Sequence, residues 1–250
     1  MTAALTAPGT APARSGDISR IVRLHLVSKS VFLGIPWIIV GGALAVSIVI
    51  GIILQSAGID PGAGMRYSWA VLSPQWYLVV AGVQAVGLTF SFALGLTATR
   101  RDFWLGTMLL FVLVALFNGV AFTILIALEK ATGGWWLDIH MFDALWYGID
   151  GPFVDFYTTF ALQLAVLVVG AAATTVYMRW RIPGMLWVAL GAVVLLLAAL
   201  AILTATNGWL SLIAWFGSIG LVGGFSLLVG LAAVLAVGGY VVIRGATPRS

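Results

Sequence analysis

The feature that most constrains this chain is a series of six long apolar runs. Each run is close to the ~20 residues that a helix needs to cross ~30 Å of hydrocarbon. The fold class predicted from them is an all-α integral membrane protein with six transmembrane helices. The runs are placed at 33–55, 75–97, 103–128, 154–178, 184–204 and 217–243.

Composition supports lipid as the surrounding of these runs. Apolar residues make up 62% of the chain and charged residues 8%, whereas soluble domains contain about 45–50% and about 25%. So few charges could not cover the surface of a water-soluble chain of 250 residues. The net charge of +4 is explained by orientation in the membrane, so no nucleic-acid partner is expected.

The basic residues predict the orientation of the chain. Cytoplasmic segments of membrane proteins are enriched in Lys and Arg, and this asymmetry is satisfied if both ends of the chain are cytoplasmic. The predicted outer segments then contain only Arg66 and Lys130, together with most of the acidic residues. The predicted cytoplasmic segments contain Arg14, Arg20, Arg23, Lys29, Arg100, Arg101, Arg179, Arg181, Arg244 and Arg249.

Three regions follow from this pattern. Residues 1–16, rich in Ala, Thr and Pro, are predicted to form a disordered cytoplasmic tail. Residues 17–30 predict an interfacial amphipathic helix, although a plain basic lead into the first span is the alternative. Residues 31–250 are predicted to form the six-helix transmembrane domain. Within it, residues 207–216, with Trp209 and Trp215, are expected to be either a short re-entrant or interfacial helix or an extension of the sixth span.

The sequence offers no catalytic pattern. It contains no cysteine, no phosphate-binding loop with its Gly-Lys-Ser/Thr ending, and neither a His-Glu-x-x-His nor a Gly-x-Ser-x-Gly motif. We interpret His25 and His140 as interfacial polar groups, and the outer carboxylates as solvated loop residues. The chain is therefore predicted to be no enzyme and to hold no metal or cofactor.

The connection between the second and third predicted spans, from Phe90 to Thr107, is very tight. It brings Arg100, Arg101, Asp102 and Phe103 to the cytoplasmic surface. Charge alone assigns these residues no more than an orienting role.

This connection resembles the first cytoplasmic connection of permease subunits in bacterial ABC-type exporters of the type-2 family, where a pattern like FxFALG…TRRxF…GT recurs. The segment from Arg23 to Trp37, with its Gly-Ile-Pro-Trp start of the first span, is also similar to bacterial members. The resemblance extends loosely over the chain, but the outer segment before the sixth span is shorter than in the better-known exporters, which leaves the substrate and the outer gate open.

The resemblance implies a permease in the bacterial cell membrane that pairs with a second permease subunit, as a homodimer or a heterodimer. A separate ATP-binding cassette ATPase subunit would bind the ATP. It further implies that Arg100, Arg101, Asp102 and Phe103 lie at the surface that couples the permease to this ATPase.

Three amides lie within the predicted spans, namely Gln84, Asn118 and Gln163. At ~1.5 Å per residue each is roughly 13–15 Å from the outer end of its helix. They are predicted to hydrogen-bond between helices, with a lining of the transport path as the alternative.

The alternative function is an ATP-independent membrane protein, either a secondary transporter or a structural subunit of a larger complex. A coupled carrier normally needs an ionisable group in the membrane interior. No such group lies well inside a predicted span, which favours the permease.

Overall fold

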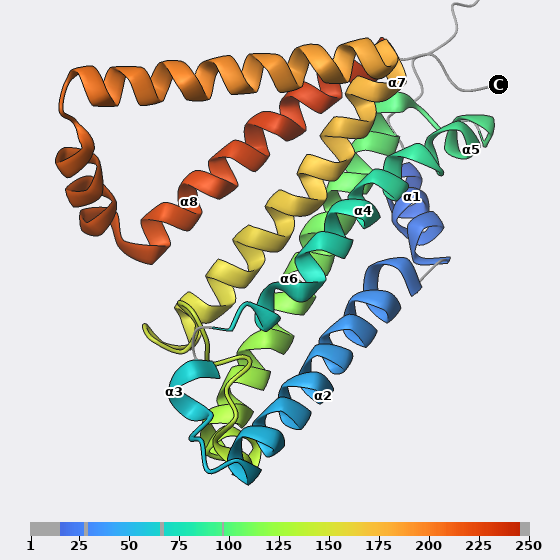
Figure 1. The fold of residues 1–250 in the computed structure, drawn as a ribbon. Coiled ribbons are helices and arrows are strands. Elements are labelled where there is room, and N and C mark those ends of the chain that lie inside the picture. Colours follow the sequence, from blue (N-terminus) through green and yellow to red (C-terminus); the bar gives the residue numbers. More distant parts are fainter. Residues whose placement is uncertain (1–15, 28–29, 66–67, 97, 246–250) are drawn as a thin grey trace, which may run out of the picture.

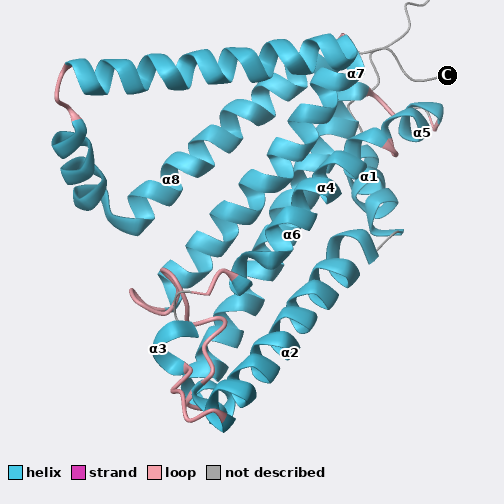
Figure 2. Cartoon of the chain, in the orientation of Figure 1, coloured by secondary structure: helices cyan, strands magenta, loops and turns pink. Residues whose placement is uncertain are grey.

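The computed structural model describes residues 16–27, 30–65, 68–96 and 98–245. All regular secondary structure in these residues is helical (Figure 2). Most of the predicted tail, residues 1–15, lies outside the described residues, as do Lys29 and Arg66.

The first helix, α1 (Gly16–Val27), packs against the beginning of α6 (Arg100–Ala131). A Cβ atom added to Gly106 would lie 2.7 Å from the Cβ of Ile21, so only glycine permits this approach. A helix is therefore present where the interfacial helix was predicted, and it is joined to the bundle by buried side chains.

The next helices form one side of the bundle. A π-helical turn at Ser30–Gly34 leads into α2 (Ile35–Ser56). The short α3 (Gly62–Met65) and a 3₁₀ turn at Ala70–Leu72 follow. Helix α4 (Ser73–Gly87) comes next, and two residues separate it from α5 (Phe90–Gly95). At this interruption the hydroxyl of Thr89 donates a hydrogen bond to the carbonyl of Ala85, a contact that bends helices.

Helix α7 (Pro152–Ala205) contains 54 residues and has one sharp break. Arg181 has φ 57° and ψ −150°, a region that residues with side chains rarely adopt. Pro183 lies two residues after the break, in the first turn of the following helical segment, where the N–H that proline lacks would have no helical partner. The predicted spans 154–178 and 184–204 lie on the two sides of this break.

Helix α8 (Trp209–Arg244) has a similar break at Gly220, with φ 63°. We call residues 182–219, between the two breaks, the α7–α8 arm. In Figure 1 the arm leaves the bundle and α8 returns toward it. The second part of α8 packs along α7, where the hydroxyls of Tyr157 and Ser226 lie 2.7 Å apart. The segment predicted over 207–216 thus belongs to a short helix that Gly220 separates from the rest of α8.

The two ends of the bundle differ in charge. One end, which we call the basic end, contains α1, the beginning of α6, the break in α7 and the end of α8 (Figure 1). The other, the outer end, contains the long connection from Thr132 to Gly151. The described basic residues at the basic end are Arg20, Arg23, Arg100, Arg101, Arg179, Arg181 and Arg244, and Lys130 lies at the outer end.

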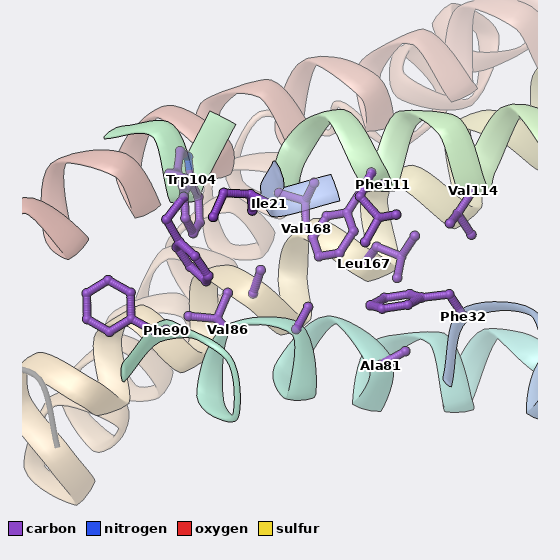
Figure 3. Close-up of a cluster of buried hydrophobic side chains, with 14 of the residues drawn as sticks. Ile21, Phe32, Ala81, Val86, Phe90, Trp104, Phe111, Val114, Leu167 and Val168 are labelled. Carbon is purple, nitrogen blue, oxygen red and sulfur yellow. The ribbon is translucent and has the colours of Figure 1, made fainter. Parts of the chain in front are cut away.

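Close helix packing holds the bundle together. A Cβ at Gly82 of α4 would lie 2.2 Å from the carbonyl oxygen of Leu167, and one at Gly170 of α7 would lie 2.2 Å from that of Val79. Small residues allow this approach in membrane helices, where hydrophobicity gives no drive for helices to associate. Figure 3 shows the large side chains that fill the remaining interior, among them Phe90, Trp104 and Phe111.

Among the described residues, five helical segments are long and apolar enough to cross a membrane: Ser30–Ser56, Ala70–Gly95, Arg100–Ala131, Pro152–Ala205 and Trp209–Arg244. The predicted all-helical fold is confirmed, but the count of six spans stays a prediction, because the fourth and fifth predicted spans are contained in one broken helix.

Candidate functional site

The four residues predicted to couple the chain to an ATPase lie at the start of α6 and differ in exposure. Arg101 is exposed, Arg100 and Asp102 are half-buried, and Phe103 is fully buried. The four residues are therefore not a single exposed surface. Arg101 presents its charge to the surroundings and Phe103 supports the turn from beneath.

Asp102 and Thr99 form the N-terminal cap of α6. The hydroxyl of Thr99 donates to a carboxylate oxygen of Asp102 at 2.6 Å and accepts a hydrogen bond from the backbone N–H of Asp102 at 3.1 Å. A carboxylate in the first turn also interacts favourably with the helix dipole. Asp102 thus has a local structural role that fixes where α6 begins.

Beneath this turn lies a buried contact with α1. Nε2 of His25 and the hydroxyl of Thr107 are 3.1 Å apart, and the centroid of the His25 ring lies 6.0 Å from the ring centroids of both Phe32 and Phe103. Burial lowers the pKa of His25 to about 4. The interpretation of His25 as an interfacial group was wrong, because the side chain is 2% exposed.

The same turn is joined to the end of α8. The indole N–H of Trp104 donates to the carbonyl of Ala236 at 3.0 Å, and a Cβ at Gly239 would lie 2.6 Å from the Trp104 ring. The guanidinium of Arg100 donates to the carbonyl of Arg244. The start of α6 is therefore connected to α1 on one side and to α8 on the other.

The structure brings together two of the three predicted amides. Asn118 Nδ2 donates to Oε1 of Gln163 at 2.6 Å, and the indole N–H of Trp37 donates to Oδ1 of Asn118 at 3.2 Å. This connects α2, α6 and α7 in the interior, as predicted for hydrogen bonds between helices. Gln84 lies elsewhere, half-buried at the wall of a cavity between α4 and α7.

A buried carboxylate that the sequence pattern did not reveal lies at the outer end. Glu129 is fully buried and accepts hydrogen bonds from the backbone N–H groups of Met141, Phe142 and Asp143 and from the indole of Trp135, at 2.7–3.1 Å. The prediction of a solvated loop carboxylate was wrong for Glu129. Its donors lie 6 to 14 residues further along the chain, in a loop without periodic pattern, so no sequence signal points to them.

A second buried carboxylate extends this network. Asp155, 3% exposed, accepts a hydrogen bond from the N–H of Gly148 at 2.7 Å, so it too was wrongly predicted to be solvated. Lys130 forms an ion pair with Asp143 at 3.6 Å and donates to the carbonyl of Gly148. These contacts hold the long connection against the bundle.

Two further side chains of this connection are buried. His140 is 6% exposed and lies 3.2 Å from Asp138, so its interpretation as an interfacial group was also wrong. Burial raises the pKa of Tyr147 to about 12, so its phenol stays neutral.

Within the described residues, no group of three or more His, Asp or Glu side chains has the arrangement of a metal site. The contacts described above connect three helices at the basic end and hold the long connection against the bundle at the outer end. No family model, curated protein or solved structure matches the chain.

Proposed function

We propose that this chain is the permease subunit of an ATP-driven transporter of the bacterial cell membrane. It would act with a second permease subunit and with a separate ATP-binding cassette ATPase, which would bind and hydrolyse the ATP. The observation that carries the proposal is the junction at the start of α6, where exposed Arg101 lies directly above the buried contacts of Phe103 and Trp104.

The junction suits a part on which an outside subunit acts. A partner that displaces the turn at Arg101 would move α6, and with it α1 through Thr107 and α8 through Trp104. Packed interiors transmit such displacement because they cannot deform continuously. The lack of a nucleotide-binding motif in the chain agrees with an energy source on a partner.

The proposed topology has six spans, with the basic end in the cytoplasm. The concentration of arginines at this end supports the orientation. The parts of α7 before and after Arg181 are about 43 Å and about 36 Å long at ~1.5 Å per residue, so each is long enough to cross the hydrocarbon. To cross the membrane, the part of α7 after Arg181 must turn toward the bundle axis, and the breaks at Arg181 and Gly220 are the positions where the chain can change direction.

Single cysteines test this topology without background, because the chain contains none. In intact cells, Asp60→Cys, Asp150→Cys and Asn207→Cys should react with a membrane-impermeant maleimide, whereas Arg101→Cys should react only after permeabilisation. Protection of Asn207→Cys in intact cells, with reaction after permeabilisation, would contradict the fifth span.

The α7–α8 arm supports the pairing with a second permease subunit. No residue from 182 to 219 is buried, and the large exposed side chains include Leu186, Trp187, Leu195 and Leu210. A patch of this size exceeds what monomeric proteins usually expose to solvent. Lipid can cover part of it, and the second permease subunit is proposed to cover the rest.

The buried carboxylates do not favour a proton-coupled carrier. Glu129 and Asp155 lie at the outer end of the bundle, and backbone N–H groups hold both of them. Their contacts account for their burial as structural anchors of the outer connection.

The coupling proposal is tested with Arg101→Gln in protein purified from its native host. The Arg101 side chain forms no hydrogen bond or ion pair with other described residues, so the variant should fold and insert normally. Its association with the ATPase subunit should weaken by about 1–3 kcal/mol, seen as reduced co-elution and reduced ATP hydrolysis after reconstitution.

Arg23→Gln is the matched control, because Arg23 is an exposed arginine of the same end on α1. It should retain full association. Unchanged association in Arg101→Gln would contradict the coupling surface, and the absence of any ATPase from wild-type preparations would contradict the proposed function as a whole.

A further inference from the structure

A cavity of about 380 Å³ lies between α4, α5 and α7 near the basic end. Most of its wall is apolar, with Val83 and Leu88 on one side and Met178 and Met185 on the other. Among the described residues of the wall, Arg181 is the only charged one.

The cavity exists because two closely packed helices separate. At Gly82 the backbones of α4 and α7 are in contact, but α4 ends at Gly87 and α7 breaks at Arg181. A Cβ at Gly87 would meet only a methyl group of Thr174, at 3.6 Å. The space beside Gly87 is therefore open to a larger apolar group.

Along α7 the cavity wall runs from Ala173 to Arg181, about 12 Å at ~1.5 Å per residue. Its apolar part extends toward the middle of the bundle, and Arg181 lies at the end of the helix before the break. A ligand that fits this cavity has an apolar chain, with an anionic group at the end that lies near Arg181.

Within the part of the chain that the structure describes, no carboxylate neutralises the charge of Arg181. No carboxylate among the described residues forms an ion pair with it, and its guanidinium carbon lies 6.0 Å from the centroid of the Tyr177 ring. The helices of the basic end contain two acidic residues, Asp17 on α1 and Asp102 on α6, and Asp102 is bound by Thr99. Arginines near a membrane surface attract anionic headgroups.

We propose that this cavity binds an acyl chain of an anionic phospholipid, whose headgroup phosphate pairs with Arg181. The apolar wall suits the chain, and a guanidinium is a strong donor for phosphate oxygens. The wall also contains the uncharged polar residues Gln84, Ser91, Thr174 and Tyr177, but most of its surface is apolar. This apolar surface distinguishes the site from one for a free anion, which would need more polar groups, in place of Val83 and Met178. The inference rests on the break of α7 at Arg181 as the structure has it, and it does not require the ATP-driven transport proposed above.

The experiment uses the purified wild-type chain in phosphatidylcholine nanodiscs that contain a trace of phosphatidylglycerol with a photoreactive acyl chain. After illumination, mass spectrometry maps the labelled peptides. Label should concentrate in 83–91 and 173–185, and it should exceed by about fivefold or more the label from phosphatidylcholine with the same photoreactive chain. Equal labelling by the two lipids would overturn the proposal.

Arg181→Gln should reduce the phosphatidylglycerol label to the phosphatidylcholine level, whereas the neighbouring Arg179→Gln should leave it unchanged. Arg179 lies outside the cavity wall and stacks on Trp180, 4.7 Å from the ring centroid. Undiminished label in Arg181→Gln, or an equal loss in Arg179→Gln, would contradict a specific contact with Arg181.

Gly87→Leu provides a second test that leaves the charge intact. Its side chain should fill the cavity and reduce the label from both lipids, while Gly42→Leu, at a position with no atom within 4 Å of an added Cβ, should not. In a final experiment, inorganic phosphate is added to the wild-type protein before illumination. Loss of the phosphatidylglycerol label at millimolar phosphate would identify a site for the free anion and overturn the proposal of a lipid.

Discussion

The bundle and the α7–α8 arm are similarly apolar in sequence, but their side chains have different surroundings. In the most apolar 18-residue stretch of α6, 44% of the residues are buried, whereas none is buried in the corresponding stretch of α7. In the bundle, glycines allow backbone contact and amides connect helices. The arm lacks such contacts in the isolated chain. Hydropathy therefore identifies segments suited to lipid, and small and polar residues decide which of them pack together.

The largest expected difference between the two regions is in their tolerance of a larger side chain at glycine. Gly82→Leu places its Cβ 2.2 Å from the carbonyl oxygen of Leu167, so α4 and α7 must separate. The free energy of unfolding should fall by about 3 kcal/mol or more. Gly191→Leu in the arm meets no atom within 4 Å of its Cβ and should have no effect.

Thermal unfolding in detergent, followed by tryptophan fluorescence, measures both variants. A large loss of stability in Gly191→Leu would show that the arm packs in the isolated chain, and the distinction between the two regions would then fail.

The next largest effect is expected at Glu129, which holds the outer connection to the bundle. Glu129→Ala leaves four donors without their acceptor and should cost about 3 kcal/mol. Asp150→Ala removes the same charge from an exposed position of the same connection and should change little. The measurement is the same unfolding experiment. Equal effects of the two substitutions would mean that charge matters here and the buried hydrogen bonds do not.

A smaller effect tests whether α1 belongs to the bundle. His25 has a pKa of about 4 in the folded protein and about 6.5 in the unfolded chain. Between these values the unfolded chain binds more protons, so the stability present above pH 6.5 is lost as the pH falls toward 4. At pH 5 the expected loss relative to pH 7.5 is about 2 kcal/mol.

His25→Gln should remove this part of the pH dependence, as measured by melting temperatures at pH 5 and pH 7.5. If the variant keeps the full difference between the two pH values, His25 is not the group responsible, and the burial of α1 against α6 loses its support.

Much of the fold could be predicted from the sequence because apolar runs of about 20 residues have few alternatives to membrane helices. The beginning of α6 near Arg100 was also predictable, since charges and a tight turn end a span. The direction of the α7–α8 arm could not be predicted, because the apolar runs 154–178 and 184–204 do not specify the angle between the two helical segments. That depends on the backbone of Arg181.

The candidate site was predictable only in part, for a geometric reason. Distance from the end of a helix gives the depth of a side chain but not the direction in which it points. Gln84, Asn118 and Gln163 were placed at a similar depth, yet only the last two face each other. Glu129 was missed because its donors belong to an irregular loop that folds back onto it.

The smallest expected effect on the free energy of unfolding concerns these three amides. Asn118→Leu removes the acceptor of Trp37 and the donor to Gln163, and should lower the free energy of unfolding by about 1 kcal/mol, the usual scale of hydrogen bonds between membrane helices. Gln163→Leu should cost a similar amount. Gln84→Leu should cost nothing, because the Gln84 side chain forms no hydrogen bond with other described residues.

The double variant Asn118→Leu with Gln163→Leu completes a thermodynamic cycle that isolates the contact. Because each single variant already breaks the bond, the double variant should be less destabilised than the sum of the two, by about 0.6 kcal/mol. Additive losses would mean that the two amides do not interact. If Asn118→Leu instead keeps normal stability but changes which compounds a reconstituted transporter moves, Asn118 would belong to the transport path. The polar connection between α2, α6 and α7 would then serve transport and not packing.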